Sequence, residues 1–455
     1  MIYHCEDHTC NYWDEGEKLP ERCPQCGRKL LRANEADMTG DDWTALGNTL
    51  WDAEASDKKR MVDCFRKAAY LGSAWGVCNL GICMEQGNGV EADPVQAFWL
   101  YQQAVEMGSL NAVCCLGVCY QYGIGTAPDA KQAAELYCKA AEYGSPRGQM
   151  LLARAFHDGI GVEADAAEAV YWVRAAAYQR YGEGMHRLGV CYEYGDGVEQ
   201  NWERAVHWFC EAAESGVGVA MTDLGYCYEK GCGVEQNWQE AVKWYEQGAQ
   251  CGNLQSMHNL ACCYEHGEGV EQDMKKAICW YERAAEQNHP AAMNSLGECY
   301  AMGRGVPRDL ETAMEWYRRA AELGEAMADY NMGWHLEQAG KLSEAYTHYR
   351  KAADGNDDSA WWALGRFYEN GVVVAQDGKE ARRCYETGEK LGSVKCKMRL
   401  ARCKLLGIGG RRAKKAGLDL CRQALELAKE SSEKEDYGYE AEMNLLRRTI
   451  AENES

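Results

Sequence analysis

The chain has 455 residues, of which 46% are apolar and 26% are charged, and it carries a formal net charge of −21. This acidic balance argues against general binding to nucleic acids or to anionic membrane surfaces. The sequence has no apolar run of about 18 residues, so we expect no membrane span. Its start lacks the basic and apolar regions of a secretory signal, so we expect none.

Two cysteine pairs lie in the first 32 residues, separated by a dozen positions. The second pair forms a tight Cys-Pro-x-Cys-Gly knuckle, in which the glycine accepts the turn after the second thiol. Four thiolates suit a tetrahedral ion, and so short a segment needs metal to supply its folding energy. We therefore expect residues 1–32 to resemble a zinc ribbon with one structural Zn²⁺, bound by Cys5, Cys10, Cys23 and Cys26.

The first cysteine pair is wider than the usual Cys-x2-Cys spacing, and other readings of this segment stay open, including that its cysteines are incidental. His4 and His8 are alternative ligands if one of the first two cysteines does not bind the ion. A redox dithiol at Cys23 and Cys26 is a second alternative, and a nucleic-acid role of the segment is a third.

A sequence motif then recurs, mostly every 36 residues, through residues 33–430. The stretches 189–202, 225–238 and 261–274 are near copies of one another. A fixed period in this range is typical of stacked helical repeats. A Leu-Gly step, or its variant, marks eleven repeats; its second residue is Gly47, Gly81, Gly117, Ala153, Gly189, Gly225, Ala261, Gly297, Gly333, Gly365 and Ala401.

Each repeat is expected to form two helices, A and B. Helix A carries a small residue four positions before the leucine, which lets two helices approach closely. It ends at a Gly-x-Gly-Val turn, whose first glycine suits a left-handed C-terminal cap. Helix B carries Ala-x-x-Trp-Tyr-x-x-Ala-Ala and ends at another glycine, such as Gly108 or Gly144.

One cysteine recurs at the same position of helix A. Equivalent helices lie roughly 8–10 Å apart, whereas a disulfide needs Cα atoms within about 7 Å. We therefore expect free, buried thiols that act as small apolar side chains, and hence a reducing cytoplasm. This column contains Cys83, Cys119, Cys191, Cys227, Cys263 and Cys299.

The combined pattern, Ala-x3-Leu-Gly-x2-Tyr-x2-Gly-x-Gly-Val followed by the helix B motif, resembles the Sel-1-like repeat family. These repeats are short relatives of tetratricopeptide repeats. The resemblance implies an all-α, right-handed α-solenoid of about eleven repeats that scaffolds protein complexes without catalysis. Its partners would be other proteins or peptides, with no small-molecule substrate. The stretch 332–356 lacks four loop residues and looks like an ordinary tetratricopeptide unit.

A hydrolase is the alternative function, because some cysteine-rich members of the family are linked to β-lactamase-type chemistry. The pairs Ser56 with Lys59 and Ser431 with Lys434 match Ser-x-x-Lys, but neither Ser-Asp-Asn nor Lys-Thr-Gly accompanies them. Both pairs are interpreted as solvated helix ends. The Gly-x-Gly step follows a helix rather than a strand, which argues against phosphate binding.

Three positions of helix A vary between repeats while their neighbours stay fixed, and they share one helical face. Because helix A lines the concave side of solenoids of this type, we expect these residues to form a peptide groove rich in Tyr and Arg. A plain solvated face is the alternative. The candidate partner-binding residues are Asn79, Tyr122, Arg154, Arg187, Tyr194, Asp223, Tyr226, Lys230, Asn259, His266 and Glu298.

Toward the C-terminus the charge turns basic, between Lys390 and Arg422. Three interpretations of this stretch are open. It balances acidic neighbours within the chain, it contacts an acidic surface of a partner, or it binds RNA or phosphate. Residues 431–455 are expected to form a capping helix for the open end of the solenoid. Its predicted inward-facing residues are Met443, Leu446 and Ile450.

Overall fold

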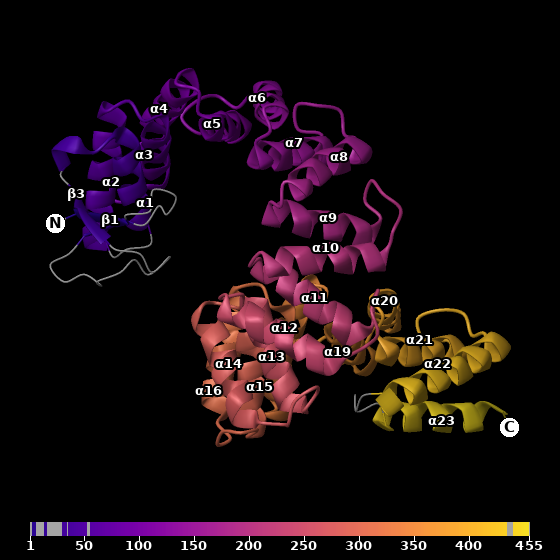
Figure 1. Ribbon diagram of the computed structural model, residues 1–455. Coiled ribbons are helices and arrows are strands. Elements are labelled where there is room, and N and C mark those ends of the chain that lie inside the picture. Colours follow the sequence, from indigo (N-terminus) through magenta and orange to yellow (C-terminus); the bar gives the residue numbers. More distant parts are fainter. Residues whose placement is uncertain are drawn as a thin grey trace. The chain divides into compact units, whose positions relative to one another are not determined.

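The chain divides into two compact units, unit 1 (residues 1–237) and unit 2 (residues 238–455). Both consist mainly of helices stacked in chain order, each packed against the next (Figure 1). The computed structural model describes residues 2–5, 13–15, 30–33, 35–51, 55–434 and 440–454.

Unit 1 begins with three short antiparallel strands in the order β2-β1-β3, followed by a 3-10 helix at Glu35–Asp37. The strands are β1 (Ile2–Cys5), β2 (Trp13–Glu15) and β3 (Leu30–Ala33). The backbone of Cys5 ends β1, whereas Cys10, Cys23 and Cys26 lie outside the described residues. The expected zinc site therefore stays a prediction.

The rest of unit 1 alternates A and B helices, as the repeat predicts, with the Leu-Gly step inside each A helix. The A helices are α1 (Gly40–Thr49), α3 (Ala74–Gln86), α5 (Leu110–Tyr122), α7 (Pro146–Asp158), α9 (Gly182–Tyr194) and α11 (Gly218–Lys230). The B helices are α2 (Ala55–Tyr70), α4 (Pro94–Glu106), α6 (Ala130–Glu142), α8 (Ala166–Tyr178) and α10 (Trp202–Glu214).

Unit 2 continues the alternation and confirms the helical-repeat solenoid. Its A helices are α13 (Leu254–His266), α15 (Pro290–Met302), α17 (Ala326–Gln338), α19 (Asp358–Asn370) and α21 (Val394–Leu406). Its B helices are α12 (Trp238–Gln250), α14 (Met274–Glu286), α16 (Leu310–Glu322), α18 (Leu342–Asp354), α20 (Gly378–Lys390) and α22 (Lys414–Lys434). None of the helices in the described ranges has both the length and the hydrophobicity that a membrane crossing requires.

The loop between helices A and B also links neighbouring repeats. Its first glycine caps helix A in the left-handed region, as predicted; Gly159 has φ +69°. Its second glycine, Gly161, has φ +70°, and a Cβ there would lie 1.9 Å from the carbonyl oxygen of Ala130. The second glycine is therefore required because the loop presses on the start of the preceding helix B.

The repeat at α17 and α18 has the shortened loop that the sequence predicts. Only residues 339–341 separate the two helices, and Gly340 makes the turn with φ +75°.

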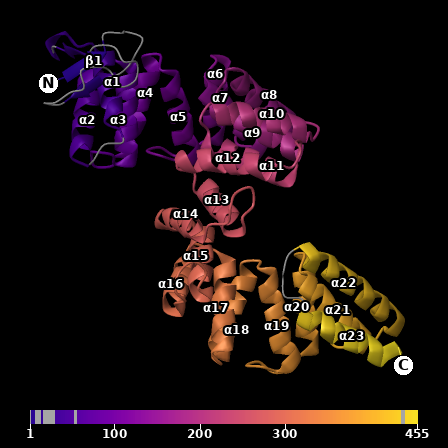
Figure 2. The same cartoon turned by 60° about the horizontal axis from the view of Figure 1, so that its bottom comes forward.

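At the C-terminus, helix α23 (Glu440–Glu454) packs against α21 and α22 (Figure 2). Met443 and Leu446 are buried there, as predicted for these two side chains. The predicted bounds differ, because residues 431–434 belong to α22 and the last helix spans Glu440–Glu454. The capping role stays a prediction. Part of the basic stretch is balanced internally. Arg399 forms an ion pair with Glu442, at 2.7 Å between Nε and Oε2, and Arg399 and Arg402 both form ion pairs with Glu369 of α19.

Val373 occupies the second glycine position of its loop, and its backbone has φ +63°. A β-branched residue is strained in the left-handed region, at a cost on the order of 1–3 kcal/mol. We expect Val373→Gly to raise the free energy of unfolding by about 1 kcal/mol, measured by urea denaturation. Val372→Gly is the matched control and should lower it, because Val372 packs against the core. If both variants lowered the free energy of unfolding by the same amount, the backbone of Val373 would not be strained.

Candidate functional site

Several repeats are held together by a contact that we call the tyrosine lock: a small helix A residue (a glycine, or Ala261 opposite Tyr281), a buried helix B tyrosine and a polar acceptor near the end of helix A. A Cβ on Gly117 would lie 2.5 Å from the ring of Tyr137, so the glycine makes room for the ring. The Tyr137 hydroxyl donates to Gln121 at 2.7 Å. Each lock therefore buries a ring without leaving its hydroxyl unpaired.

The same geometry recurs in unit 2, where the acceptor is a carboxylate. The Tyr281 hydroxyl donates to Glu265 at 2.8 Å, and that of Tyr385 donates to Glu369 at 2.8 Å. Burial raises the pKa of both phenols well above its usual range, so they remain hydrogen-bond donors.

The α7/α8 repeat lacks the lock. Its three equivalent positions are occupied by Ala153, Val173 and His157, and all three line a pocket of about 520 Å³ between α7, α8 and α9. The other lining residues are Arg147, Met150, Leu151, Arg154, Asp158, Ala169, Val170, Tyr181, Glu183, Arg187, Cys191 and Asp196.

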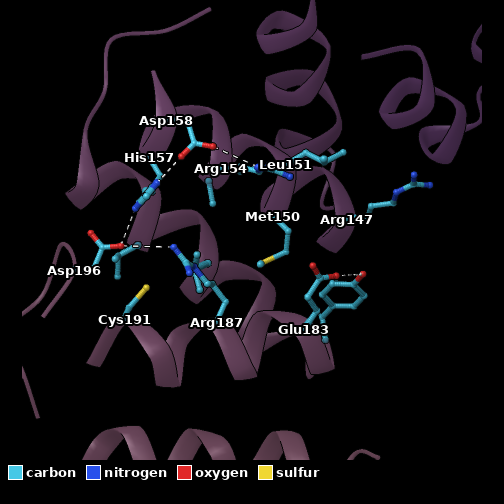
Figure 3. Close-up of a pocket in the computed structure, with 15 residues that line it drawn as sticks. Arg147, Met150, Leu151, Arg154, His157, Asp158, Glu183, Arg187, Cys191 and Asp196 are labelled. Carbon is cyan, nitrogen blue, oxygen red and sulfur yellow. Dashed lines mark hydrogen bonds and ion pairs between the residues drawn. The ribbon is translucent and has the colours of Figure 1, made fainter. Parts of the chain in front are cut away.

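A chain of ion pairs and hydrogen bonds crosses one side of this pocket (Figure 3). His157 lies between two carboxylates, with Nδ1 2.7 Å from Asp158 and Nε2 3.2 Å from Asp196. Arg154 contacts Asp158 at 3.4 Å, and Arg187 contacts Asp196 at 3.6 Å. The hydrogen bond from His157 lowers the pKa of Asp158. Both carboxylates are thus held at the pocket by neighbouring cationic or polar groups.

Arg147 lies at the other side of the pocket from this network (Figure 3). Its Nη1 donates to Asn111 at 2.8 Å and approaches Cys115 Sγ at 3.6 Å. Within the described part of the chain, no carboxylate forms an ion pair with Arg147. Nearby, Glu183 accepts a hydrogen bond from the Tyr181 hydroxyl at 3.2 Å.

None of the eleven candidate partner-binding residues is buried. The structure places two of them, Arg154 and Arg187, in the pocket wall. Six are exposed: Tyr122, Arg154, Tyr194, Tyr226, Lys230 and His266. Five are half-buried: Asn79, Arg187, Asp223, Asn259 and Glu298.

Some of these side chains are held by internal contacts. In unit 1, Asp223 pairs with His186 at 2.7 Å. In unit 2, Glu298 accepts hydrogen bonds from Asn294 and Asn331, each at 3.1 Å. Asp223 and Glu298 therefore stabilise contacts between neighbouring A helices.

The tyrosines of the predicted face project into solvent. Tyr194 is 72% exposed and Tyr226 is 44% exposed. The ammonium of Lys230 lies 5.9 Å from the centre of the Tyr226 ring, which places a cation beside an aromatic surface. These residues of α9 and α11, together with Tyr122 of α5, which is 58% exposed, leave aromatic rings of the predicted face available to a partner.

Sequence reasoning missed His157, Asp196 and Val173. Their signal is a break in the helix B tyrosine column, where Val173 replaces the aromatic ring. The pairing of His157 with Asp196 also has a counterpart: Glu265 and Arg304, at the same positions of another pair of repeats, form an ion pair of 2.5 Å.

The predicted cysteine column is confirmed, since all six of its members are free and buried. Burial raises the pKa of Cys119, Cys227 and Cys299 to about 12, which keeps these thiols protonated. Across the described ranges, no group of His, Cys, Asp and Glu side chains has the arrangement of a metal site.

The two Ser-x-x-Lys pairs lie at helix ends, as interpreted from the sequence. Ser56 and Lys59 begin α2, and Ser431 and Lys434 end α22. The side chains of both serines lie outside the described residues.

Alternating A and B helices, packed through a repeated internal contact, define a helical-repeat protein of the tetratricopeptide-like class. The Sel1 repeat model matches ten segments of the sequence, which cover most of it, and the chain belongs to the Sel1 repeat family. The matched segments are 76–109, 112–145, 146–181, 182–217, 218–253, 254–289, 290–325, 326–357, 360–393 and 394–429.

Two solved structures illustrate the likeness. A protective antigen of uropathogenic Escherichia coli, described as displaying an SLR fold, is 28% identical, with 86% of this chain and 94% of that chain covered and a TM-score of 0.51. A Sel1 repeat protein from Oxalobacter formigenes is 29% identical, with 66% and 86% covered and a TM-score of 0.49. No curated protein matches the sequence.

His258 of α13 gives the repeat array a dependence on pH. Its ring lies 5.6 Å from those of both Tyr281 and His289, and burial lowers its pKa from 6.5 to about 4. The unfolded chain therefore takes up this proton first, and the stability present above pH 6.5 is lost as the pH falls toward 4.

Between pH 7 and pH 4, we expect the free energy of unfolding to fall by on the order of 2–3 kcal/mol less in His258→Asn than in the wild type. Urea denaturation at each pH measures this difference. His266→Asn, at an exposed position of the same helix, is the control and should leave the pH profile unchanged. Identical profiles for both variants and the wild type would exclude this role of His258.

Proposed function

We propose that this chain is a non-catalytic protein-interaction scaffold that binds proteins or peptides along the exposed face of its A helices. Membership of the Sel1 repeat family supports a scaffold. The observation that carries the proposal is that all eleven variable positions keep solvent access, although positions beside them, such as Leu188, Leu224 and Leu260, are buried. The exposed members of this set, such as Tyr194 and Tyr226, are thus not required for packing, whereas Asp223 and Glu298 also join neighbouring A helices.

Tyr194 and Tyr226 are the residues that we expect to contribute most to binding. Exposed tyrosines supply large contact areas at low conformational cost, and tyrosine is enriched among the residues that dominate binding energies. The acidic character of the chain makes general attraction to nucleic acids unfavourable, which also supports a protein partner.

The test compares two double variants of the full-length protein. Tyr194→Ala with Tyr226→Ala removes two rings from the A-helix face, whereas Tyr143→Ala with Tyr171→Ala removes two exposed rings outside it. Each variant is used for affinity capture from the native host, with partners quantified by mass spectrometry. We expect the first pair to reduce capture of the main partner roughly 10-fold or more, at an unchanged melting temperature.

The control pair should retain the partner at the wild-type level. If the control pair loses the partner and the A-helix pair keeps it, the binding surface lies elsewhere.

We also propose that the N-terminal segment binds one structural Zn²⁺ through Cys5, Cys10, Cys23 and Cys26. Cys5 ends β1, and Cys10 belongs to the connection from β1 to β2. Cys23 and Cys26 belong to the connection from β2 to β3, and both β2 and β3 pair with β1. Each connection therefore starts and ends at one small sheet, which supports a shared site.

Metal analysis of protein purified without chelator tests this proposal, with one zinc per chain expected. Cys23→Ala with Cys26→Ala should remove the metal, because two of the four thiolate ligands are lost. Cys251→Ala with Cys279→Ala, at exposed cysteines of the array, should not. A zinc content near zero in the wild type would exclude the site.

We further propose that the protein resides in the cytoplasm. The support is its many free thiols, which persist in a reducing compartment.

A further inference from the structure

The pocket in the α7/α8 repeat lies where other repeats keep their own aromatic ring. Tyr137 and Phe209 occupy this position in the neighbouring repeats, and both are buried. Val173 has a much smaller side chain, and its floor partners Ala153, Val170 and Cys191 are also small. The pocket therefore presents an apolar floor for which its own repeat supplies no ring.

A small residue in the tyrosine column does not by itself leave a pocket open. In the α21/α22 repeat the column holds Cys421, and the acceptor position holds Leu405; both are fully buried. They pack in one apolar cluster with Met443 and Leu446 of α23. In the α7/α8 repeat the acceptor position instead holds His157, so the opening is lined by polar groups.

These polar groups match the hydroxyl of a tyrosine. In a complete lock, the phenol donates to a carboxylate or amide oxygen at the acceptor position, as Tyr281 does to Glu265. In the pocket, His157 occupies that position and brings Asp158 and Asp196 beside it, at 2.7 and 3.2 Å. A ring that enters from outside would thus find both an apolar floor and hydrogen-bond acceptors.

The arginines at the rim of the pocket favour a ligand that carries acidic residues next to its tyrosine. Arg154 and Arg187 are paired with carboxylates of the pocket itself. Within the described residues, Arg147 donates hydrogen bonds only to Asn111 and Cys115, whereas a guanidinium has five N–H donors. An acid of the ligand can pair with these donors.

We propose that this pocket binds a tyrosine side chain from an acidic segment of a partner protein, replacing the ring that its own repeat lacks. This proposal rests on the scaffold function and specifies what one part of the scaffold recognises.

The probe is the acetylated and amidated tetrapeptide Gly-Glu-Tyr-Gly, titrated into full-length protein carrying ¹³C-labelled methionine methyl groups. The Met150 methyl lies in the pocket wall and reports binding directly. We expect a saturable shift of this signal. Replacing the peptide's tyrosine by phenylalanine should weaken binding roughly 3- to 10-fold, and alanine should abolish it.

Ala153→Gly with Val173→Tyr restores the lock residues of the other repeats and fills the pocket. We expect this double variant to remain folded and to lose peptide binding at least 10-fold. If it loses helicity, Val173→Leu applies the same test with a smaller side chain. Arg147→Gln should weaken binding of the glutamate peptide but not of the matching glutamine peptide.

Absence of a saturable Met150 shift, or binding that persists in both filled variants, would overturn the proposal. Equal affinity for free p-cresol would overturn it as well, because the acidic flank would then contribute nothing. A dimer of this chain that is seen by analytical sedimentation and lost in the filled-pocket variants would also overturn the proposal, because the occupant would then be a second copy of this chain. The failure of this proposal can be told apart from failure of the scaffold function. If the variant lacking Tyr194 and Tyr226 loses the partner while the filled-pocket variants keep it, the scaffold function holds and the pocket proposal fails.

Discussion

In each repeat that carries the tyrosine lock, the packing of a buried tyrosine ring against a small helix A residue sets how closely helices A and B approach. Gly117 and Tyr137 show the constraint, since a Cβ on this glycine would collide with the ring. Burying the ring is favourable only because its hydroxyl finds an acceptor; an unpaired one would cost on the order of 1–3 kcal/mol. Glycine, ring and acceptor therefore act together.

The loop glycines extend this constraint from one repeat to the next. Gly161 touches the carbonyl of Ala130, and Gly197 touches that of Ala166 in the same way. Each repeat is thus positioned by its immediate predecessor, which is how solenoids build a continuous core without long-range contacts. The exposed side of helix A takes no part in either contact, so its residues are free to vary.

Much of this architecture could be predicted because repetition is itself the signal. The Leu-Gly step, the capping glycines and the cysteine column each recur at a fixed spacing, and packing explains each one. The division between Asn237 and Trp238 could not be predicted, since the stretch 225–238 closely copies 189–202. The site was harder still. His157 and Asp196 belong to different repeats, and their pairing depends on how a loop folds back onto the preceding helix.

Val173 shows why a break in a column is ambiguous without the structure. Cys421 interrupts the same column, yet there Leu405 and the final helix close the space. The outcome depends on the acceptor position, which is apolar in one case and polar in the other.

The tyrosine lock also means that every repeat of this kind contains a closed recess, sealed by a side chain of its own. Losing that side chain converts an element of the core into an opening, while the backbone and the neighbouring repeats keep their places. A specific binding recess can therefore arise when a smaller residue replaces an internal aromatic ring, without any residue being added to the surface of the solenoid.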